Sequence, residues 1–451
     1  MVNRTAAGAV AGAVLACLLG VAGCGNSYRP VVSAINPVGP ASQPQKYAVA
    51  VSSPTPPGSP CPAAGQATSN GLVTIVDFSG DTVLITASLG VNPYFFGINS
   101  AGTTGYTLNC DRTLNTFDIS NQLITSQVLQ TTLLPGSNPV TLFASSSATY
   151  LADPGLSVVD QLAGSPPALK QELPVAANPV WVVGQNSSAR LYAISQGSGS
   201  GVGQVAAIET SGNTISTTLP VGRTPVYGVM TSDQRRAFIL NQGDNTVSVI
   251  NAVSNGLDTA VPSFAVGTRP VWADLVSTKN ELVVANAGTG TSAGSLTVVN
   301  IPLCSASALP TNPNCDTANP VDATGFGTVL ATVPVGINPV MVATLSDGTR
   351  AYVANAGVRG LPCAANGVAV AGVSTTCTIS VVNLTSNTVT ATIPISGHPT
   401  YIAATNSTPT GKVYVVCNDS QVMTVIETDT DTVDTTIPLQ GYGVSVRVTA
   451  Q

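Results

Sequence analysis

A small residue, two variable residues and a proline recur seven times along this chain of 451 residues. The seven segments are 90–93, 136–139, 176–179, 222–225, 267–270, 336–339 and 396–399. The first five prolines stand 40 to 46 residues apart, and the later intervals of 69 and 60 residues carry insertions. A period of about 45 residues is typical of a four-stranded propeller blade, so the spacing predicts a repeat protein.

The repeat that begins at Pro225 shows the expected strands most clearly. Short runs of β-forming residues occupy 226–231, 237–241, 246–251 and 263–266, and polar turns separate the first three. The runs are mostly apolar on both sides rather than alternating, which indicates a sheet that is covered on both faces. Blades stacked around an axis provide that environment, so we expect an all-β fold, a β-propeller.

Residues 352–355, Tyr-Val-Ala-Asn, and the strand at 378–383 resemble the second and third strands of the YVTN β-propeller repeat proteins. Similar pairs are 238–241 with 246–251 and 283–286 with 295–300. The resemblance covers nearly the whole mature chain and implies a propeller, for which the family favours seven blades. The pattern is degraded at 150–153, and Cys417 stands where the repeat has Asn.

The two ends of the chain together supply one more blade. Residues 47–51, 72–78 and 83–88 are expected to be second, third and fourth strands, and no first strand precedes them. The missing strand is expected at 442–449, where Gly443 occupies the position of the proline. We therefore predict eight four-stranded blades, with seven as the alternative, closed by a blade shared between the N- and C-termini. The propeller domain is expected to span 46–451.

The N-terminus has the order of a secretory signal peptide, with a positive start and an apolar stretch over 6–19. Residues 21–24, Val-Ala-Gly-Cys, resemble the lipobox of bacterial lipoproteins, which implies cleavage after residue 23 and lipidation of Cys24. The alternative is an ordinary signal peptide with a chance cysteine. Residues 24–45 are rich in Pro, Ser, Asn and Gly and are expected to form a tether. The protein is thus expected to be exported and anchored to the cell envelope, at the outer membrane or cell surface or on the periplasmic side.

Cysteine usage agrees with export. Apart from Cys17 and Cys24, seven cysteines remain, and an odd number leaves one unpaired. Two pairs flank insertions, so the expected disulfides are Cys304–Cys315 and Cys363–Cys377. Cys61 and Cys110 follow the second strands of adjacent blades and are candidates for a third, a pairing that the sequence leaves open. Cys417 is then expected to be a buried free thiol.

Composition excludes several classes of function. Only 8% of the residues are charged and the net charge is −6, so helical surfaces built on Glu–Lys pairs and a nucleic-acid partner are excluded. The chain has one histidine, His398, which argues against multi-histidine metal sites, and it has no Gly-x-Ser-x-Gly elbow. We expect no metal, no cofactor and no catalytic residue. The acidic run 427–434 resembles calcium-site spacing but lacks the loop glycine, and it aligns with an ordinary turn.

The turns before the prolines are expected to surround one mouth of the channel. Their polar residues form a candidate ligand mouth: Asn92, Asn138, Asn178, Arg223, Arg269, Asn338, His398 and Tyr442. The alternative is that asparagine before proline only builds the turn. Two residues after the proline, five repeats carry an aromatic residue, either for packing between blades or as a ligand cage: Phe95, Trp181, Tyr227, Trp272 and Tyr401. Asp274 is either a carboxylate that faces the mouth or a hydrogen-bonded strand residue.

Insertions at 52–70, 196–204 and 356–377 all follow second strands and are expected to project from the same face as the mouth. Loops on a repeat scaffold usually carry its function. The favoured function is a lipid-anchored, monomeric binding scaffold at the cell envelope, with an envelope protein or polymer as partner. The competing class is a propeller enzyme, either a lactonase-like hydrolase or a quinone-dependent dehydrogenase, which rests on fold analogy alone.

Overall fold

Eight antiparallel sheets form the β-propeller in the computed structural model of the chain. The structure describes residues 46–57, 61, 69–119, 128–199, 201–302, 325–364, 367–405 and 411–449. None of these residues forms a helix long and apolar enough to cross a membrane. Cys24, the signal peptide and the tether up to residue 45 lie outside the described residues, as do Cys304 and Cys315.

We number the blades from the one that joins the two ends of the chain, and within each blade the strands run from the channel outward. Blade 1 is β33 (Tyr442–Val448), β1 (Tyr47–Ser53), β2 (Asn70–Asp77) and β3 (Thr82–Val91). Blade 2 is β4 (Pro93–Ile98), β5 (Thr104–Asn109), β6 (Thr113–Asp118) and β7 (Leu129–Thr132). Blade 3 is β8 (Thr141–Ala144), β9 (Thr149–Asp153), β10 (Val158–Ala163) and β11 (Ala168–Pro174). Blade 4 is β12 (Pro179–Val183), β13 (Arg190–Ser195), β14 (Val202–Glu209) and β15 (Thr214–Arg223).

The second half of the ring repeats this order. Blade 5 is β16 (Pro225–Met230), β17 (Arg236–Asn241) and β18 (Thr246–Asn251), and two short strands, β19 (Gly256–Leu257) and β20 (Ser263–Ala265), both pair with β18. Blade 6 is β21 (Pro270–Val276), β22 (Glu281–Asn286), β23 (Ala293–Asn300) and β24 (Thr328–Ile337). Blade 7 is β25 (Pro339–Thr344), β26 (Arg350–Asn355), β27 (Thr378–Asn383) and β28 (Thr388–Pro394). Blade 8 is β29 (Pro399–Ala404), β30 (Lys412–Cys417), β31 (Val422–Glu427) and β32 (Thr432–Pro438).

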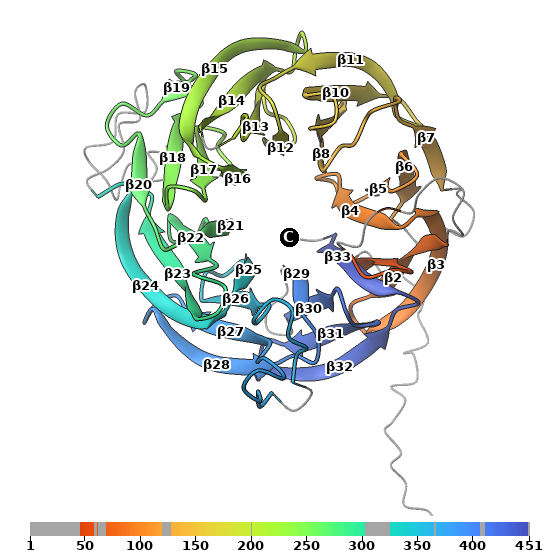
Figure 1. Cartoon of the computed structure of the whole chain (residues 1–451), viewed down its shortest axis with the longest axis vertical. Coiled ribbons are helices and arrows are strands. Elements are labelled where there is room, and N and C mark those ends of the chain that lie inside the picture. The colour runs from red at the N-terminus through yellow and green to blue at the C-terminus, as the bar shows by residue number, and fades with distance from the viewer. Residues whose placement is uncertain are drawn as a thin grey trace, which may run out of the picture. The chain divides into compact units, whose positions relative to one another are not determined.

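The first strand of every blade lies at the centre of the ring, and the outermost strands form its rim (Figure 1). Because neighbouring strands are antiparallel, the ring has two distinct faces. The face that we call the proline face carries the connections between blades and the turns from second to third strands. The opposite face, the hairpin face, carries the turns from first to second and from third to fourth strands.

Blade 1 closes the ring by pairing strands from the two ends of the chain. β33 lies antiparallel to β1 with Ala48 opposite Val448 and Ala50 opposite Val446. The amide of Tyr47 also donates a hydrogen bond of 2.8 Å to Oγ1 of Thr449. The prediction of eight blades closed by a shared blade is therefore confirmed, and the seven blades that the family resemblance favours are not what the chain forms.

The repeated glycine has a steric reason. A Cβ atom on Gly222, which ends the fourth strand of blade 4, would lie 2.6 Å from Cγ of Asn241 in blade 5. The same contact joins Gly90 to Asn109 at 2.6 Å, measured to Nδ2, and Gly336 to Asn355 at 2.7 Å, measured to Cγ. A side chain at these glycines would collide with the asparagine, so these junctions need glycine. Ala176 and Ser396 stand at the same position in two other junctions, where Ser195 and Cys417 replace the asparagine.

The asparagine at the end of the second strand ties two strands of its own blade together. Nδ2 of Asn355 donates to Oγ1 of Thr378 at 3.1 Å and to Oγ of Ser380 at 3.0 Å, both on the third strand. Asn355 is fully buried, so each of these hydrogen bonds satisfies a group that would otherwise be costly to bury. In blade 8 Cys417 takes this position, and it is a buried free thiol for that reason.

A tyrosine on the second strand links its blade to the next. The hydroxyl of Tyr414 in blade 8 donates to Oδ1 of Asp81 in blade 1 at 2.9 Å, and Tyr150 donates to Oδ1 of Asn213 at 2.7 Å. The acceptors lie in turns between third and fourth strands and have positive φ, 52° at Asp81 and 49° at Asn213. Asp431, from the acidic run 427–434, is another such turn residue and forms an ion pair with Arg350 of blade 7.

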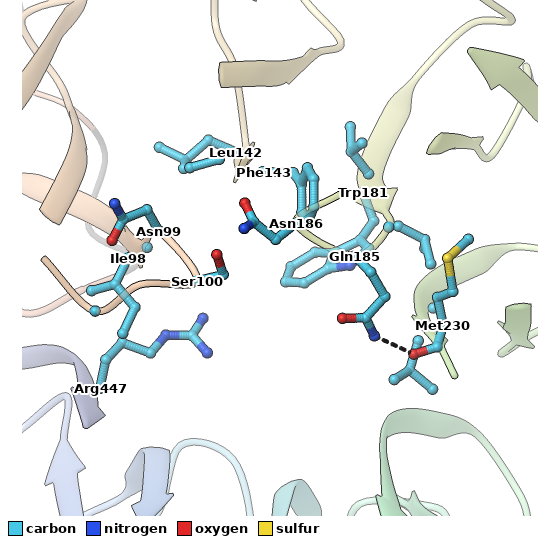
Figure 2. Close-up of a pocket in the computed structure, with 18 of the residues that line it drawn as sticks. Ile98, Asn99, Ser100, Leu142, Phe143, Trp181, Gln185, Asn186, Met230 and Arg447 are labelled. Carbon is cyan, nitrogen blue, oxygen red and sulfur yellow. Dashed lines mark hydrogen bonds between the residues drawn. The ribbon is translucent and has the colours of Figure 1, made fainter. Parts of the chain in front are cut away.

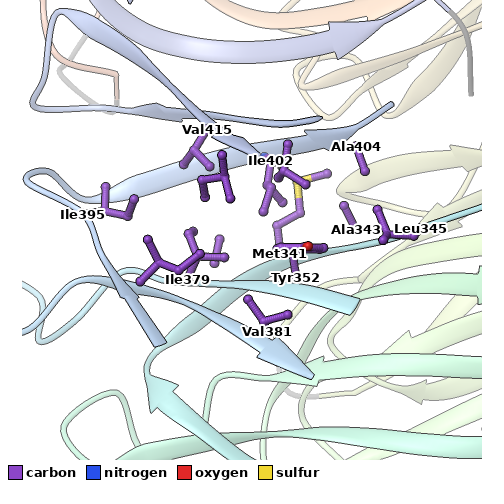
Figure 3. Close-up of a cluster of buried hydrophobic side chains, with 14 of the residues drawn as sticks. Met341, Ala343, Leu345, Tyr352, Ile379, Val381, Ile395, Ile402, Ala404 and Val415 are labelled. Atoms are coloured by element: carbon purple, nitrogen blue, oxygen red, sulfur yellow. Dashed lines mark hydrogen bonds between the residues drawn. The ribbon is translucent and has the colours of Figure 1, made fainter. Parts of the chain in front are cut away.

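Apolar side chains fill the spaces between the blades. Figure 3 shows one such cluster, in which Ile379 and Val381 of blade 7 lie opposite Ile402 and Val415 of blade 8. All four side chains are fully buried. The core of the protein is thus divided into layers between neighbouring sheets, each formed by two blades.

Removal of β33 is expected to destabilise the whole ring. A variant that ends at Gly441 loses the inner strand of blade 1 and exposes the edge of β1, so its thermal unfolding midpoint should fall by more than about 10 °C. The matched control ends at Thr449 and should unfold like the full chain. Differential scanning calorimetry makes the comparison, and an unchanged midpoint for the Gly441 variant would refute closure through β33.

The buried carboxyl group of Asp160 is expected to make the stability of the fold depend on pH. This residue of β10 is 3% exposed, and burial, followed by the charges of Asp153 and Glu172, raises its pKa to about 7. A raised carboxyl pKa means that the native state binds the proton more tightly, so stability is lost as pH rises from about 4 to about 7. Asp160→Asn, which mimics the protonated acid, should stabilise the fold by about 2–4 kcal/mol above pH 7 and have little effect below pH 4.

Urea unfolding above pH 7 and below pH 4 measures the effect of Asp160→Asn on the free energy of unfolding. The exposed Asp434→Asn variant is the control for a change of charge alone. Equal effects of Asp160→Asn at the two pH values would contradict the raised pKa.

Candidate functional site

The first strands place two layers of side chains around the channel. One layer consists of the residues two positions after the proline, or after Gly443 in β33: Phe95, Thr141, Trp181, Tyr227, Trp272, Met341, Tyr401 and Ser445. The other consists of the residues four positions after it: Gly97, Phe143, Val183, Val229, Asp274, Ala343, Ala403 and Arg447. We call these the aromatic layer and the upper layer.

The aromatic layer joins five blades through ring contacts. Tyr227 stacks on Trp272 with ring centroids 4.0 Å apart, and Trp181 lies 4.8 Å from Tyr227. The contacts continue from Trp181 to Phe95 at 6.2 Å and from Trp272 to Tyr401 at 5.8 Å. These residues pack against one another and also line cavities, so the two interpretations from the sequence describe the same cluster.

Two adjoining cavities occupy the channel on the side of the hairpin face. The first, of about 440 Å³, is bounded by blades 1 to 5, and the second, of about 620 Å³, by residues of blades 4 to 8 and of blade 1. Both are lined by Gln185, Tyr227 and Arg447. All eight residues of the upper layer line one or both cavities, so every blade contributes to the site.

Arg447 brings a positive charge to both cavities. Its guanidinium carbon lies 4.3 Å from the centroid of the Tyr401 ring, a cation–π contact. Figure 2 shows the guanidinium group directed into the first cavity, with Ser100, Asn186 and Trp181 around the same space. Nε is buried without a hydrogen-bond partner among the described residues, and no described carboxylate forms an ion pair with Arg447.

Asp274 brings a carboxylate to the second cavity. Its Oδ2 accepts hydrogen bonds of 2.8 Å from the amide and the hydroxyl of Thr344 in blade 7, and Oδ1 accepts one of 2.9 Å from the amide of Leu275. Burial raises the pKa of Asp274, and these hydrogen bonds oppose the shift. Asp274 therefore both faces the cavity and joins blade 6 to blade 7, so the two alternatives from the sequence are not exclusive.

Polar groups on the hairpin turns form the outer rim of the cavities. Nε2 of Gln185 donates a hydrogen bond of 2.7 Å to the carbonyl of Met230, which fixes this side chain between the cavities (Figure 2). Further hydroxyl and amide groups come from Asn99, Ser100, Asn186, Ser232, Ser277 and Ser346. The site thus has an aromatic layer, a polar rim and Arg447, a cation without a carboxylate partner in the part of the chain that the structure describes.

The candidate mouth residues from the sequence lie on the proline face, and none of them lines either cavity. Asn92, Asn178 and Asn338 have φ of 44°, 59° and 54°, which is the conformation that asparagine tolerates in tight turns. Arg269, with φ of 56°, stands in the same place. The backbone amide of Asn138 donates a hydrogen bond to Oδ1 of Asp153, and Tyr442 lies opposite Ser53 in blade 1.

Two of the candidate mouth residues lie close to carboxylates at the proline face. Nε of Arg223 lies 2.6 Å from Oδ1 of Asp244, and Nε2 of His398 lies 3.7 Å from Oδ2 of Asp419. Asn178 donates to Oε1 of Gln196 at 2.7 Å. The turn-building alternative accounts for these contacts.

The structure contains the disulfides Cys61–Cys110 and Cys363–Cys377. Sγ of Cys377 lies 3.6 Å from Nδ1 of His398, which in turn is 2.6 Å from the carbonyl of Ala356. Cys363, Cys377 and His398 would be close enough to share a metal ion, but both sulfur atoms are already bonded to each other. The cluster fixes the loop after β26 to the start of blade 8.

Arg447 is the charged site residue that the sequence analysis did not identify. Its signal was present, because Gly443 had been placed at the proline position and Asp274 stands four residues after its own proline. Arg447 and Asp274 occupy equivalent positions in their blades, which a count from the proline position shows. The count does not show that the two side chains share a cavity system.

Three solved structures illustrate the likeness of this fold to known propellers. Dihydro-heme d1 dehydrogenase NirN, solved in complex with DHE, has a TM-score of 0.62 and 12% identity over 91% of this chain and 77% of its own. AztD from Citrobacter koseri has a TM-score of 0.55 and 9% identity, covering 89% of this chain and 97% of its own. A putative 6-phosphogluconolactonase from Bacteroides fragilis has a TM-score of 0.52 and 12% identity, covering 91% and 99%.

At these identities the likeness shows the fold alone. No family model matches the sequence, and no curated protein is similar to it.

Proposed function

We propose that this protein is an exported, lipid-anchored propeller of the YVTN repeat type that binds a small ligand from the cell envelope in its central channel. The observation that carries the proposal is the pair of adjoining cavities to which all eight blades contribute. Their volumes of about 440 and 620 Å³ lie within the usual range for small-molecule sites. Aromatic rings and directed polar groups line both cavities, and convergent polar groups of this kind orient a bound ligand.

The order of the N-terminal residues and the disulfides support export. Disulfides persist in oxidising compartments outside the cytosol, and two of them join loops on the proline face. A lipid on Cys24 followed by a tether would hold the propeller at the membrane surface. The alternative partner is an envelope protein or polymer. It would bind the proline face, which carries the disulfide-linked insertions.

The competing proposal is that the protein is an enzyme that converts the ligand into a product. Two of the structurally similar proteins carry the names of enzymes, a dehydrogenase and a putative lactonase. The site described here supports binding, because its residues supply stacking, a cation and hydrogen-bond donors. His398, the only histidine of the chain, lies on the other face of the ring.

Removal of Tyr227 is expected to abolish ligand retention. The protein is incubated with a small-molecule extract of its own cell envelope, and native mass spectrometry then detects what stays bound. Tyr227→Ala opens the stack between the two cavities and should reduce the retained ligand about tenfold or more. Tyr442→Ala makes the same change on the proline face and should retain the ligand.

The state of the recovered ligand separates binding from catalysis. A ligand recovered unchanged after long incubation supports the binding function, whereas conversion to a product of different mass supports the enzyme. Equal retention by the two tyrosine variants would place the site outside the channel and contradict the proposal.

Labelling with palmitate tests the anchor. Cells that express the protein are expected to incorporate labelled palmitate into the wild-type chain and not into Cys24→Ala, because the thiol is the attachment point. Cys17→Ala is the matched control and should be labelled like the wild type. Incorporation into Cys24→Ala would exclude lipidation at this cysteine.

A further inference from the structure

Arg447 carries a charge that no described residue neutralises. Four other cations with buried or partly buried side chains pair with carboxylates: Arg190 with Glu209, Arg236 with Asp258, Arg350 with Asp431 and Lys412 with Asp81. Lys279 instead donates to the carbonyl of Leu384. Asp274, the one acidic residue of the upper layer, is already engaged by Thr344 and Leu275 and forms no ion pair with Arg447. The cation is therefore available to a ligand in the channel.

The geometry of Arg447 suits an anion with two or more oxygen atoms. The guanidinium lies over the ring of Tyr401, at 4.3 Å, and this contact limits its orientation. A planar guanidinium offers paired N–H donors along its edges, which match a carboxylate or phosphate. The buried, unpartnered Nε supplies one of these donors.

The aromatic layer suits a planar group attached to that anion. Tyr227 and Trp272 stack with an interplanar angle of 23°, and Trp181 tilts against Tyr227. All three rings are only partly buried because they border the cavities. A flat conjugated ligand gains contact area and favourable ring geometry on such a surface, whereas a saturated ring gains less.

We infer that the channel binds a planar organic anion, whose carboxylate or phosphate pairs with Arg447 while its ring system lies against Trp181, Tyr227 and Trp272. This inference rests on the proposed function and specifies the chemical class of the ligand. A cationic ligand of the same shape is disfavoured because it would approach Arg447 without a free carboxylate to offset the repulsion.

Intrinsic fluorescence gives a direct assay, because the chain has two tryptophans and both line the cavities. Four probes separate charge from shape: 2-naphthoate, 2-naphthylmethanol, 2-naphthylmethylammonium and cyclohexanecarboxylate. We expect 2-naphthoate to quench the fluorescence saturably, with a Kd about tenfold or more below that of the neutral alcohol. The ammonium probe and the saturated carboxylate should bind more weakly than 2-naphthoate.

Variants assign the charge preference to one residue. Arg447→Gln should raise the Kd for 2-naphthoate to that of 2-naphthylmethanol and leave the Kd for the alcohol unchanged. Arg447→Lys keeps the charge but loses the planar fork, so its Kd for 2-naphthoate should fall between the two. Arg269→Gln removes the same charge from the proline face and should bind like the wild type; the unfolding midpoint of each variant shows whether it folds.

The outcomes distinguish this inference from the proposed function. If the alcohol or the ammonium probe binds wild type as tightly as 2-naphthoate, the channel binds ligands but the anionic class is wrong. If Arg447→Gln retains the preference for the anion, the assigned residue is wrong. If no probe binds while the envelope extract still yields a ligand that Tyr227→Ala loses, the binding function stands and the inference of a planar anion is overturned.

Discussion

The contact between a glycine at the end of one blade and a buried asparagine of the next is the constraint on which the ring depends. The glycine lets the chain pass within van der Waals distance of the asparagine, and the asparagine amide holds the second and third strands of its own blade. The junction therefore couples the spacing between blades to the hydrogen bonding within a blade. In other blades a different residue takes the place of the asparagine: Cys417 in blade 8, and Asp153 in blade 3, which accepts hydrogen bonds from the turns around it.

Charges are few in this protein, and most of the paired ones join neighbouring structural elements. Lys412 and Tyr414 of blade 8 meet Asp81 of blade 1, so an ion pair and a hydrogen bond reinforce the closure that β33 makes with β1. Arg236 and Asp258, both almost fully buried, form an ion pair within blade 5. Removing one partner of such a pair would leave an uncompensated buried charge, which is strongly destabilising. Arg447 differs from these pairs, because its guanidinium packs on the ring of Tyr401 and borders the cavities without a described carboxylate partner.

The insertions after second strands suggest a binding surface on the proline face, whereas the cavities lie on the side of the hairpin face. The proline face holds the insertions that follow second strands, the described disulfides and the candidate mouth residues. Several of those residues are engaged by neighbouring groups in the turns. On the hairpin face the turns from first to second strands are short. The cavities open beneath them because the upper layer is made mostly of small or medium side chains such as Gly97, Ala343 and Ala403. The aromatic layer thus lies nearer the proline face, and the upper layer lies nearer the hairpin face.

The sequence by itself determined the repeat, the four strands of each blade, the shared blade and so the number eight. These follow from local requirements that recur with a fixed period: a glycine where the chain passes an asparagine, a proline at the start of the first strand, and apolar runs for sheets covered on both faces. Only the tertiary structure decided which residues meet in the channel. Trp181, Trp272 and Arg447 belong to three different blades and converge because the ring closes, and their distance in sequence carries no information about that convergence. Whether an arginine is paired or free depends on the blades that face it, which is a property of the closed ring and not of its repeat.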